Sequence, residues 1–452
     1  MTFNCALVGD CVECSSPETH TRMKIPIKDI LCIVPPHEGH DSGYRLLFFN
    51  TDTSSPNTPP NLRRIRLTTV PSKLVPDHLL PNTPNIYDST NPIKLHFIIS
   101  TASGTGTAKL LFSHILQPLL SYLELDFYEV HETQSSQTIT NLCHSLFIPQ
   151  AEAGNAQTIV LLSGDGGLCD VIDAFYSTAK NIRAKPNIAL FPAGTGNAMA
   201  SSIGLVVNHK AALMALLCGK PTPVPVFAAT FSQGARYVQD GKTQCPTAAE
   251  IPCRRVHGGV VASWGLHAAL VADSDTSEYR KFGAERFRMA ANELLYPSDG
   301  SESHRYRGSV TLFGKNGQDQ GNTQPEETLG SKEHMYVLAT LVSNLEKDFM
   351  ISPESKPLDG SLRVIRFGPL PPERAMQVLS LAYQNGQHIQ DSDVIYRDVE
   401  GIRIGFNEPE GSWRRVCIDG RVIMIEEGGW LEVHKEKRHL LRILSPAPRG
   451  KQ

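Results

Sequence analysis

An aspartate in a glycine-rich turn is the part of this chain best suited to chemistry. Asp165 lies within Ser163-Gly164-Asp165-Gly166-Gly167, directly after the apolar run Thr158–Leu162. The run predicts a buried strand, and open α/β sheets bind ligands at the carboxyl ends of their strands. Glycines let backbone amides approach a phosphate, and a carboxylate beside them can accept a proton. The pattern therefore predicts a nucleotide held by backbone amides with a base next to it.

Two further glycine-rich turns follow other predicted strands. One is Ala193-Gly194-Thr195-Gly196-Asn197, and the other is Ser100-Thr101-Ala102-Ser103-Gly104-Thr105-Gly106. The latter opens a predicted helix, whose N-terminus adds partial positive charge near a phosphate. It is not a Walker A loop, because no Gly-Lys-Ser/Thr follows, and Gly104-Thr105-Gly106 is only a fragment of the dinucleotide fingerprint. Three such turns after core strands are much stronger evidence for nucleotide binding than one.

The elements that carry these turns alternate between strands and helices from Pro92 onward. The spacing of roughly 30 residues is typical of βαβ units and predicts a doubly wound parallel sheet. Leucines and an isoleucine at helical spacing predict a helix over Lys109–Leu123. The expected strands are 94–99, 126–130, 158–162 and 187–191.

After about residue 225 the alternation gives way to β-type runs separated by polar loops. This pattern predicts an antiparallel β-sandwich. Its expected strands are 256–263, 309–313, 335–341, 362–367, 401–406 and 413–418. One helix is expected within it over 273–287, and polar insertions are expected at 235–253 and 315–333.

The chain of 452 residues is long enough for two domains of ordinary size. We expect a strand-rich accessory region at 1–90, an α/β nucleotide-binding domain at 91–225, and a β-sandwich domain at 226–445 that carries the disordered insertion near 315–333. In the accessory region, the basic cluster Arg63–Arg66 could touch anionic lipid, but a solvated strand face is the more ordinary interpretation.

Composition excludes some classes of function. Hydrophobic residues make up 40% and charged residues 20%, as in globular proteins, and the net charge of -3 gives no electrostatic case for nucleic acid as a partner. The ten cysteines are scattered, and the isolated Cys11/Cys14 pair lacks the further ligands of a zinc site. No secretory signal or long apolar run is evident, so a reducing, intracellular compartment is expected. No feature predicts the oligomeric state.

Two arginines in a charged segment are candidates for phosphate contacts. Arg280 and Arg286 lie six residues apart and would occupy different faces of one straight helix unless Gly283 bends it. Arginine matches phosphate oxygens bidentately, so both could reach a triphosphate if the helix breaks. Spacing alone favours the alternative, in which each pairs at the surface with Glu278 or Glu285.

Several of these segments together resemble the successive motifs of the diacylglycerol kinase catalytic family, especially its sphingosine kinase branch. The resemblance extends from about residue 94 to 435, and 25–31 resembles the entry strand that precedes the catalytic domain. The motifs occur in the order of the family. They are Ser163–Gly166, Pro192–Ala198, Ser263-Trp264-Gly265, Glu278–Gly283 with Arg286-Phe287, and Ile418-Asp419-Gly420.

The resemblance implies a lipid kinase with ATP and lipid meeting in a cleft between the α/β domain and the β-sandwich. It implies phosphoryl transfer from Mg-ATP to the primary hydroxyl of a sphingoid base, with diacylglycerol or ceramide as the alternative acceptor. Asp165 matches the general base. Arg280 and Arg286 match phosphate-contacting positions, so the resemblance favours phosphate contacts for them, whereas spacing alone favours surface ion pairs. Asp419, followed by Gly420, matches the acid that organises phosphates and Mg²⁺. A cytoplasmic enzyme that docks transiently on membranes is expected.

Three departures concern the first domain. Ser100-Thr101 stands where the family usually has Asn-Pro, at adenine or ribose contacts. Thr133-Gln134 replaces the usual Thr-Glu, and Thr133 keeps its expected place beside the nucleotide. The acid five residues after the base, on the substrate side, is Asp170 instead of Glu.

Two departures concern the second domain. Arg421 replaces the usual Glu after Asp-Gly, so it either clamps phosphate or is compensated by Glu426 or Glu427. The aspartate that faces the amine in sphingosine kinases corresponds to Ala269, and Asp273 is the candidate to replace it. Alternatives to an active lipid kinase are a binding protein without turnover, an NAD or sugar-phosphate kinase, and a Rossmann dehydrogenase.

Overall fold

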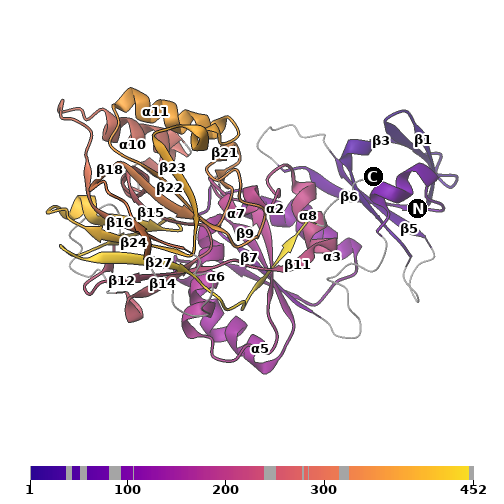
Figure 1. Ribbon diagram of the computed structural model, residues 1–452. Coiled ribbons are helices and arrows are strands. Elements are labelled where there is room, and N and C mark those ends of the chain that lie inside the picture. The colour runs from indigo at the N-terminus through magenta and orange to yellow at the C-terminus, as the bar shows by residue number, and fades with distance from the viewer. Residues whose placement is uncertain are drawn as a thin grey trace.

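The computed structural model describes residues 2–36, 43–50, 59–80, 93–104, 106–238, 251–276, 279–283, 285–314 and 325–446. Figure 1 shows three parts, with an N-terminal sheet on the right, a central α/β domain and a C-terminal β-rich domain on the left. Among the described helices, none is long and apolar enough to cross a bilayer.

The N-terminal part is a six-stranded sheet in the order β3-β2-β1-β6-β5-β4. One side of this sheet packs against the central domain, where Leu31 and Leu47 share an apolar core with Leu119. Cys5 and Cys14 lie opposite each other on neighbouring strands and form a disulfide. The elements are β1 (Thr2–Val8), β2 (Cys11–Ser15), β3 (Arg22–Pro26), β4 (Ile30–Val34), β5 (Tyr44–Asn50), β6 (Asn61–Leu67) and α1 (Val75–His78).

The central domain is built on a sheet in the order β11-β28-β10-β9-β7-β8. Its strands are parallel except β11. The strands are β7 (Lys94–Ile99), β8 (Tyr128–Glu132), β9 (Gln157–Ser163), β10 (Asn187–Pro192), β11 (Lys220–Pro223) and β28 (Arg442–Ser445). The helical segments are α2 (Ala108–Leu111), η3 (Phe112–Leu116), α3 (Gln117–Tyr122), α4 (Thr138–Leu142), η4 (Cys143–Phe147), α5 (Ile148–Ala153), α6 (Asp165–Thr178), α7 (Ala198–Ser202) and α8 (His209–Cys218).

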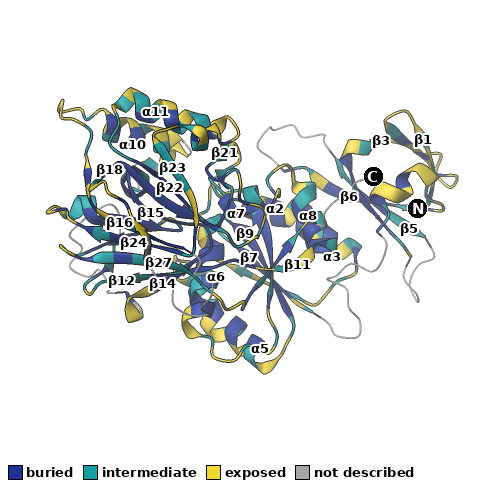
Figure 2. Cartoon of the chain, viewed as in Figure 1, coloured by how far each residue is buried: buried dark blue, intermediate teal, exposed yellow. Residues whose placement is uncertain are grey.

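Alternate residues of these strands point to opposite faces, and helices cover both faces (Figure 2). Ile159 and Leu161 of β9 pack with α4, α5 and α6, whereas Val160 and Leu162 pack with α2, α3 and α8. Every residue of β9 is buried, as expected for a central parallel strand. The chain runs from β7 to β8 on one side and then to β9 and β10 on the other, so the direction of winding reverses between β7 and β9.

The C-terminal part contains two antiparallel sheets, in the orders β14-β12-β27-β24-β16-β17 and β13-β26-β25-β15-β19-β22-β23. Trp264 is fully buried in the apolar core between them. The strands are β12 (Phe227–Phe231), β13 (Arg236–Tyr237), β14 (Arg255–Gly258), β15 (Val261–Gly265), β16 (Tyr306–Phe313), β17 (Pro325–Thr328), β18 (Glu333–His334), β19 (Tyr336–Thr340), β20 (Asn344–Glu346), β21 (Phe349–Met350), β22 (Leu362–Phe367), β23 (Val394–Val399), β24 (Gly401–Phe406), β25 (Arg415–Ile418), β26 (Arg421–Met424) and β27 (Trp430–Lys435). The helices are α9 (Leu266–Ser274), α10 (Glu285–Leu295) and α11 (Pro372–Ser380).

The predicted fold class, a doubly wound α/β domain followed by an antiparallel β domain, is confirmed. Some predicted elements differ in detail. The expected strand 256–263 is divided between β14 and β15, and the expected helix 273–287 is broken, with Gly283 at a φ of 57°. Within the expected insertion at 315–333, residues 315–324 lie outside the described residues, and Pro325–Thr328 forms β17. Residues 239–250 of the other expected insertion also lie outside them.

Candidate active site

The three glycine-rich turns lie against one another at the point where the sheet reverses its winding. A Cβ atom on Gly164 would lie 3.1 Å from Cα of Gly194, and one on Gly194 would overlap the backbone of Gly164. A Cβ on Gly104, which has a φ of 54°, would collide with the carbonyl oxygen of Ala193. Only glycine permits these approaches, so the turns are held together by backbone contacts.

This packing predicts different costs for two glycine substitutions. Gly194→Ala should destabilise the fold by about 1–3 kcal/mol or more, because the backbone of Gly164 must move to admit the methyl group. Gly166→Ala is the matched control, since a Cβ there meets nothing within 4 Å and the residue lies in the first turn of α6. Thermal unfolding should show a lower Tm for Gly194→Ala only. Equal Tm values for both variants would contradict the close contact of the turns.

Asp165 begins α6 and points toward the start of α7. Its Oδ2 accepts a hydrogen bond from the backbone N–H of Ala198 at 2.7 Å, and its Oδ1 accepts one from Met199 at 3.1 Å. Burial raises the pKa of Asp165 to about 6, aided by the nearby carboxylate of Asp419 and opposed by the two backbone hydrogen bonds. A carboxylate with a pKa near 6 is mostly ionised at neutral pH and can still hold a proton, as a general base requires.

The glycine-rich turn that precedes α7, Ala193–Asn197, is held by hydrogen bonds of its own. Asn197 has a φ of 54°, and its side chain accepts from the N–H of Gly194 and donates to the carbonyl oxygen of Gly194. On the neighbouring turn, the Thr101 N–H donates to Oγ1 of Thr133 at 3.0 Å, and the Thr101 hydroxyl donates to the Thr133 carbonyl at 2.8 Å. The hydroxyls of Ser100 and Ser103 are 2.6 Å apart. Thr101 and Thr133 therefore join the ends of β7 and β8.

One face of α6 carries polar side chains toward the second domain. Asp165, Cys169 and Asp173 follow one another at a spacing of four residues, so they share a face of the helix. The Cys169 thiol donates to Oδ2 of Asp419 at 3.1 Å, and the backbone N–H of His257 donates to Oδ1 of Asp173 at 2.9 Å. The helix that begins with the candidate base thus also links the two domains.

Asp419 lies in the tight turn between β25 and β26. Asp-Gly favours such turns because both residues adopt positive φ, here 49° for Asp419 and 86° for Gly420. Backbone N–H groups of Gly259, Val260 and Val261 donate to its buried carboxylate at 2.6–3.0 Å, in addition to the Cys169 thiol. Both oxygens already accept two hydrogen bonds each. The expected role of Asp419 as a Mg²⁺ ligand therefore does not fit this geometry, in which it ties the turn to β15 and α6.

The two unusual residues Arg421 and Asp170 lie together. Arg421 Nη2 donates to Oδ1 of Asp170 at 2.6 Å, and Nη1 donates to Oδ2 of Asp173 at 2.9 Å. All three side chains are less than one-quarter exposed. Burial raises the pKa of Asp170, against the effect of Arg421, whereas at Asp173 hydrogen bonds from His257 and Arg421 outweigh burial and lower the pKa. Arg421 is compensated by Asp170 and Asp173 rather than by the Glu426 or Glu427 proposed from the sequence.

The other expected site residues lie in different surroundings. Ala269 is buried, and Asp273 accepts from Nη1 of Arg415 at 2.7 Å, so its carboxylate is committed to that pair. Nη1 of Arg286 lies 3.7 Å from Oδ1 of Asp275, and the guanidinium group lies over the ring of Phe287. The side chain of Arg280 lies outside the described residues. The break at Gly283, which the sequence required for both arginines to face one ligand, is present.

A cavity of about 620 Å³ opens beside the second glycine-rich turn. Its volume is in the ordinary range for small-molecule and cofactor sites. Thr195, Gly196 and Asn197 of the first domain line it, and so do Lys347 and Tyr383 of the second domain. Neither Asp165 nor Arg286 is among the described residues that line it. A much smaller hollow is lined by Asp165, the candidate base, and by Gly164 and Asn197 among others.

Sequence reasoning missed the second-domain side of this cavity. Glu346, Lys347 and Asp348 lie in and next to the β20–β21 hairpin, and the Tyr383 hydroxyl donates to Glu346 at 2.6 Å. The hairpin reaches the first domain through Ser202 of α7, whose hydroxyl accepts from the Asn344 N–H at 3.0 Å. No motif marks this segment. The only signal in the sequence is a lysine between two acids, a pattern common on protein surfaces.

Comparisons with known proteins show which families the chain is similar to. Residues 94–229 match the family model of the diacylglycerol kinase catalytic domain. Sphingosine kinase 1 of Rattus norvegicus is 22% identical over 395 residues, which cover 80% of this chain and 94% of the relative. Sphingosine kinase 1 of Homo sapiens is 24% identical over 377 residues, which cover 76% of this chain and 89% of the relative. A putative diacylglycerol kinase from Bacillus anthracis, 14% identical, shares the fold over 78% of this chain and 97% of its own, with a TM-score of 0.51.

Proposed function

We propose that this lipid kinase, whose residues 94–229 match the family model of the diacylglycerol kinase catalytic domain, transfers the γ-phosphoryl group of Mg-ATP to the primary hydroxyl of a sphingoid base. The observation that carries the proposal is Asp165, a carboxylate whose pKa is raised to about 6 and which lies where three glycine-rich turns meet. The choice of a sphingoid base rests on the similarity to sphingosine kinases over most of the chain.

In this proposal the backbone of the turns holds the nucleotide phosphates, and Asp165 accepts the proton of the attacking hydroxyl. Phosphoryl transfer needs mainly positioning and charge neutralisation, so rigid turns and nearby cations are the groups that matter most. Mg²⁺, carried by the nucleotide, supplies part of that neutralisation when bound. The wall of the cavity formed by Thr195, Gly196 and Asn197 offers backbone amides for phosphate oxygens. Arg280 and Arg286 remain proposed phosphate contacts, and Ser100 to Gly106 with Thr133 the proposed nucleotide side.

Lys347 supplies a further test of nucleotide binding at the cavity. Lys347 is exposed and lines the cavity together with the glycine-rich turn. Hydrogen bonds to charged groups contribute about 1.5–3 kcal/mol, so Lys347→Ala should raise the KM for ATP roughly tenfold or more while leaving the lipid KM unchanged. Lys356→Ala removes an exposed lysine of the same domain outside the cavity and is the matched control. Equal KM values for ATP in the two variants would exclude Lys347 from the nucleotide site.

The proposed reaction is tested with purified protein, labelled ATP, Mg²⁺ and a panel of sphingosine, dihydrosphingosine, ceramide and diacylglycerol in mixed micelles. We expect phosphorylation of the sphingoid bases at a kcat/KM at least tenfold above that for the other lipids. Product from diacylglycerol or ceramide alone would support a lipid kinase and would contradict a sphingoid base as its substrate. ATP binding without product from any lipid would favour a binding protein without turnover.

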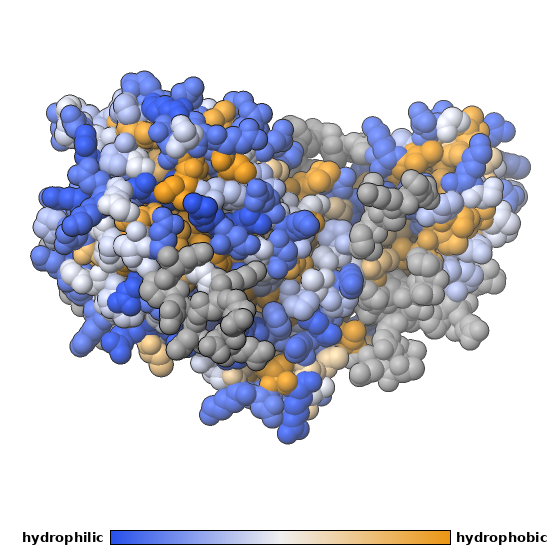
Figure 3. All heavy atoms as spheres, in the orientation of Figure 1, coloured by the Kyte–Doolittle hydropathy of each residue, from blue (hydrophilic) through white to orange (hydrophobic). Residues whose placement is uncertain are grey.

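Transient membrane contact is part of the proposal, since the substrate resides in a bilayer. Figure 3 shows apolar residues in patches among polar ones on the face in view. Phe282, next to the break at Gly283, exposes 55% of its surface. Flotation of the protein with anionic and neutral liposomes measures this contact, and we expect binding that is stronger on the anionic ones. Recovery of all protein in the unbound fraction with both kinds of liposome would contradict transient docking on membranes.

A further inference from the structure

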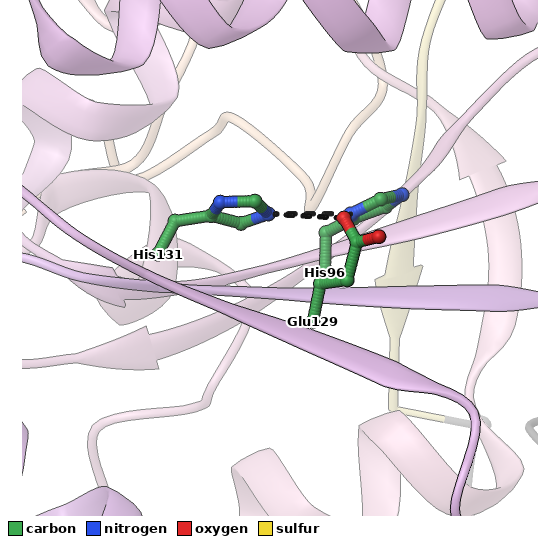
Figure 4. A group of neighbouring side chains, drawn as sticks. All are labelled: His96, Glu129 and His131. Carbon is green, nitrogen blue, oxygen red and sulfur yellow. Dashed lines mark hydrogen bonds and ion pairs between the residues drawn. The ribbon is translucent and has the colours of Figure 1, made fainter.

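Three side chains with metal-binding atoms converge on one face of the central sheet, away from the glycine-rich turns. His96 lies on β7, and Glu129 and His131 lie on the neighbouring edge strand β8. In the parallel register, His96 is paired with Glu129 and Ile98 with His131. Glu129 and His131 are two residues apart and therefore share a face of the strand. Figure 4 shows the three side chains directed toward one another from these two strands.

The distances between the converging atoms suit a tetrahedral ion. His96 Nδ1 lies 3.3 Å from Glu129 Oε2 and 3.4 Å from His131 Nε2, and His131 Nε2 lies 3.6 Å from Glu129 Oε2. Ligand atoms bound tetrahedrally to Zn²⁺ at about 2.0–2.1 Å lie about 3.3–3.4 Å from each other. The three atoms thus form one triangular face of a zinc coordination shell with little adjustment.

The surroundings hold these side chains in place. His96 is fully buried against the ring of Phe147, and its Nε2 has no hydrogen-bond partner among the described residues, so its polar contacts are made through Nδ1 alone. Lys94 binds the other oxygen of Glu129 at 2.6 Å and leaves Oε2 directed at the imidazoles. Such a contact orients a carboxylate as groups around metal ligands do. Burial lowers the pKa of His96 to about 4 and also that of His131, so both rings are neutral at pH 7, the form that binds metals.

We infer that His96, Glu129 and His131 form a binding site for a divalent transition-metal ion, with Zn²⁺ as the ion that fits best. Two histidines and a carboxylate leave at least one coordination position for water, unlike the closed four-ligand sites of structural zinc. The partly exposed Glu129 and His131 give solvent access to that position. The ammonium group of Lys94 opposes a second cation, which makes the ion exchangeable rather than permanent.

Metal binding at this point would link β8 to β7 beneath the nucleotide turns. His96 lies four residues before Ser100, about 13 Å along an extended strand, and the strand ends are already joined through Thr101 and Thr133. An ion that fixes the edge strand to its neighbour therefore stabilises the base of the loop that opens the nucleotide site. No residue of the proposed active site takes part in the cluster.

The test uses the full-length protein after treatment with EDTA and gel filtration, titrated with Zn²⁺ in a calorimeter and with Co²⁺ in a spectrophotometer. Wild type should bind one equivalent more tightly than His131→Ala by at least tenfold, because losing groups that merely support metal ligands already costs about 10–100-fold. The Co²⁺ complex should show visible bands of tetrahedral geometry without the near-ultraviolet band of thiolate ligands, which separates this site from binding at cysteines. Zn²⁺ should raise the Tm of wild type and not that of His131→Ala.

Two further variants make the outcome unambiguous. His144→Asn removes an exposed histidine on η4, near Phe147 but outside the cluster, and should bind Zn²⁺ as wild type does. Glu129→Gln, at a side chain that is 41% exposed, replaces His131→Ala if that variant does not fold, and should lose the same equivalent. Equal Zn²⁺ stoichiometry and affinity in wild type and in a folded cluster variant would overturn the metal site. This result would leave the proposed kinase reaction untouched, since the assay measures binding alone.

Discussion

Asp165→Asn is expected to lower kcat by about 10²–10⁴-fold while leaving ATP binding nearly unchanged, because the substitution keeps the shape of the side chain and removes the carboxylate proposed as the base. The amide oxygen of asparagine can still accept one of the two hydrogen bonds that Ala198 and Met199 donate to the carboxylate. Steady-state kinetics with the preferred lipid, together with ATP affinity by calorimetry, measure the two effects separately. Asp126→Asn, at an exposed acid of the same domain, is the control and should behave as wild type.

The pH dependence of wild type provides a second readout for the same residue. Because the pKa of Asp165 is about 6, kcat should rise with pH as the carboxylate ionises near pH 6 and then level off. The folded pKa lies above the ordinary value of 3.8, so this group stabilises the fold most below pH 3.8. That contribution is lost as the pH rises through about 6, and Asp165→Asn should remove it. An active variant with an unchanged pH profile would exclude Asp165 as the base.

The central domain was predictable because its signals are local. Each of its core strands is a continuous apolar run that ends in glycine or a small residue, and β7 matches the expected 94–99. β9 and β10 extend the predicted strands by only one or two residues. The expected strand at 126–130 is displaced to Tyr128–Glu132, since this edge strand carries polar residues that do not mark its end. The glycine turn around Asp165 was recognisable for the same reason, as a short segment with an unusual composition.

The parts that were missed depend on contacts between residues far apart in the chain. β28 pairs with β10 across more than half of the sequence, and no local pattern of Arg442–Ser445 shows that it completes the sheet of the first domain. Asp419 matched a family motif, but its hydrogen bonds to the backbone of Gly259 and Val260 follow from the packing of β25 against β15. The sequence likewise placed Lys347 in no motif, because its position on the cavity is set by a hairpin that reaches across from the second domain.

The ion pairs of Arg421 also join residues far apart in the chain, so no local pattern predicts them. Arg421 appeared unfavourable at a position where the resemblance implies a glutamate, yet it binds two acids of α6 that lie about 250 residues earlier. Arg421→Gln leaves Asp170 and Asp173 facing each other without their cation. Removing one partner of a buried ion pair costs about 3–5 kcal/mol, and these side chains are mostly buried, so we expect a loss of about 3 kcal/mol in the free energy of unfolding.

Arg421→Glu should be more harmful still, although it introduces the residue that the resemblance implies. Three carboxylates would then lie within one partly buried cluster, and like charges at such distances repel strongly. Denaturant unfolding should rank stability as wild type above Arg421→Gln above Arg421→Glu, and Arg403→Gln, whose pair with Glu432 is more exposed, should change it by less than about 1 kcal/mol. Greater stability of Arg421→Glu than of Arg421→Gln would show that the pairs with α6 are not formed.

A double-mutant cycle separates the ion pair from other effects of the arginine. Asp170→Asn alone should destabilise the protein, whereas in the background of Arg421→Gln it should do little or even restore stability, because it removes a carboxylate that has lost its partner. The coupling energy between the two positions should be about 1–3 kcal/mol.

Because α6 begins with Asp165, loosening its attachment to the second domain should also lower kcat while the pH profile keeps its midpoint near 6. Activity that falls only in proportion to the unfolded fraction would show that the pair stabilises the fold without positioning the base.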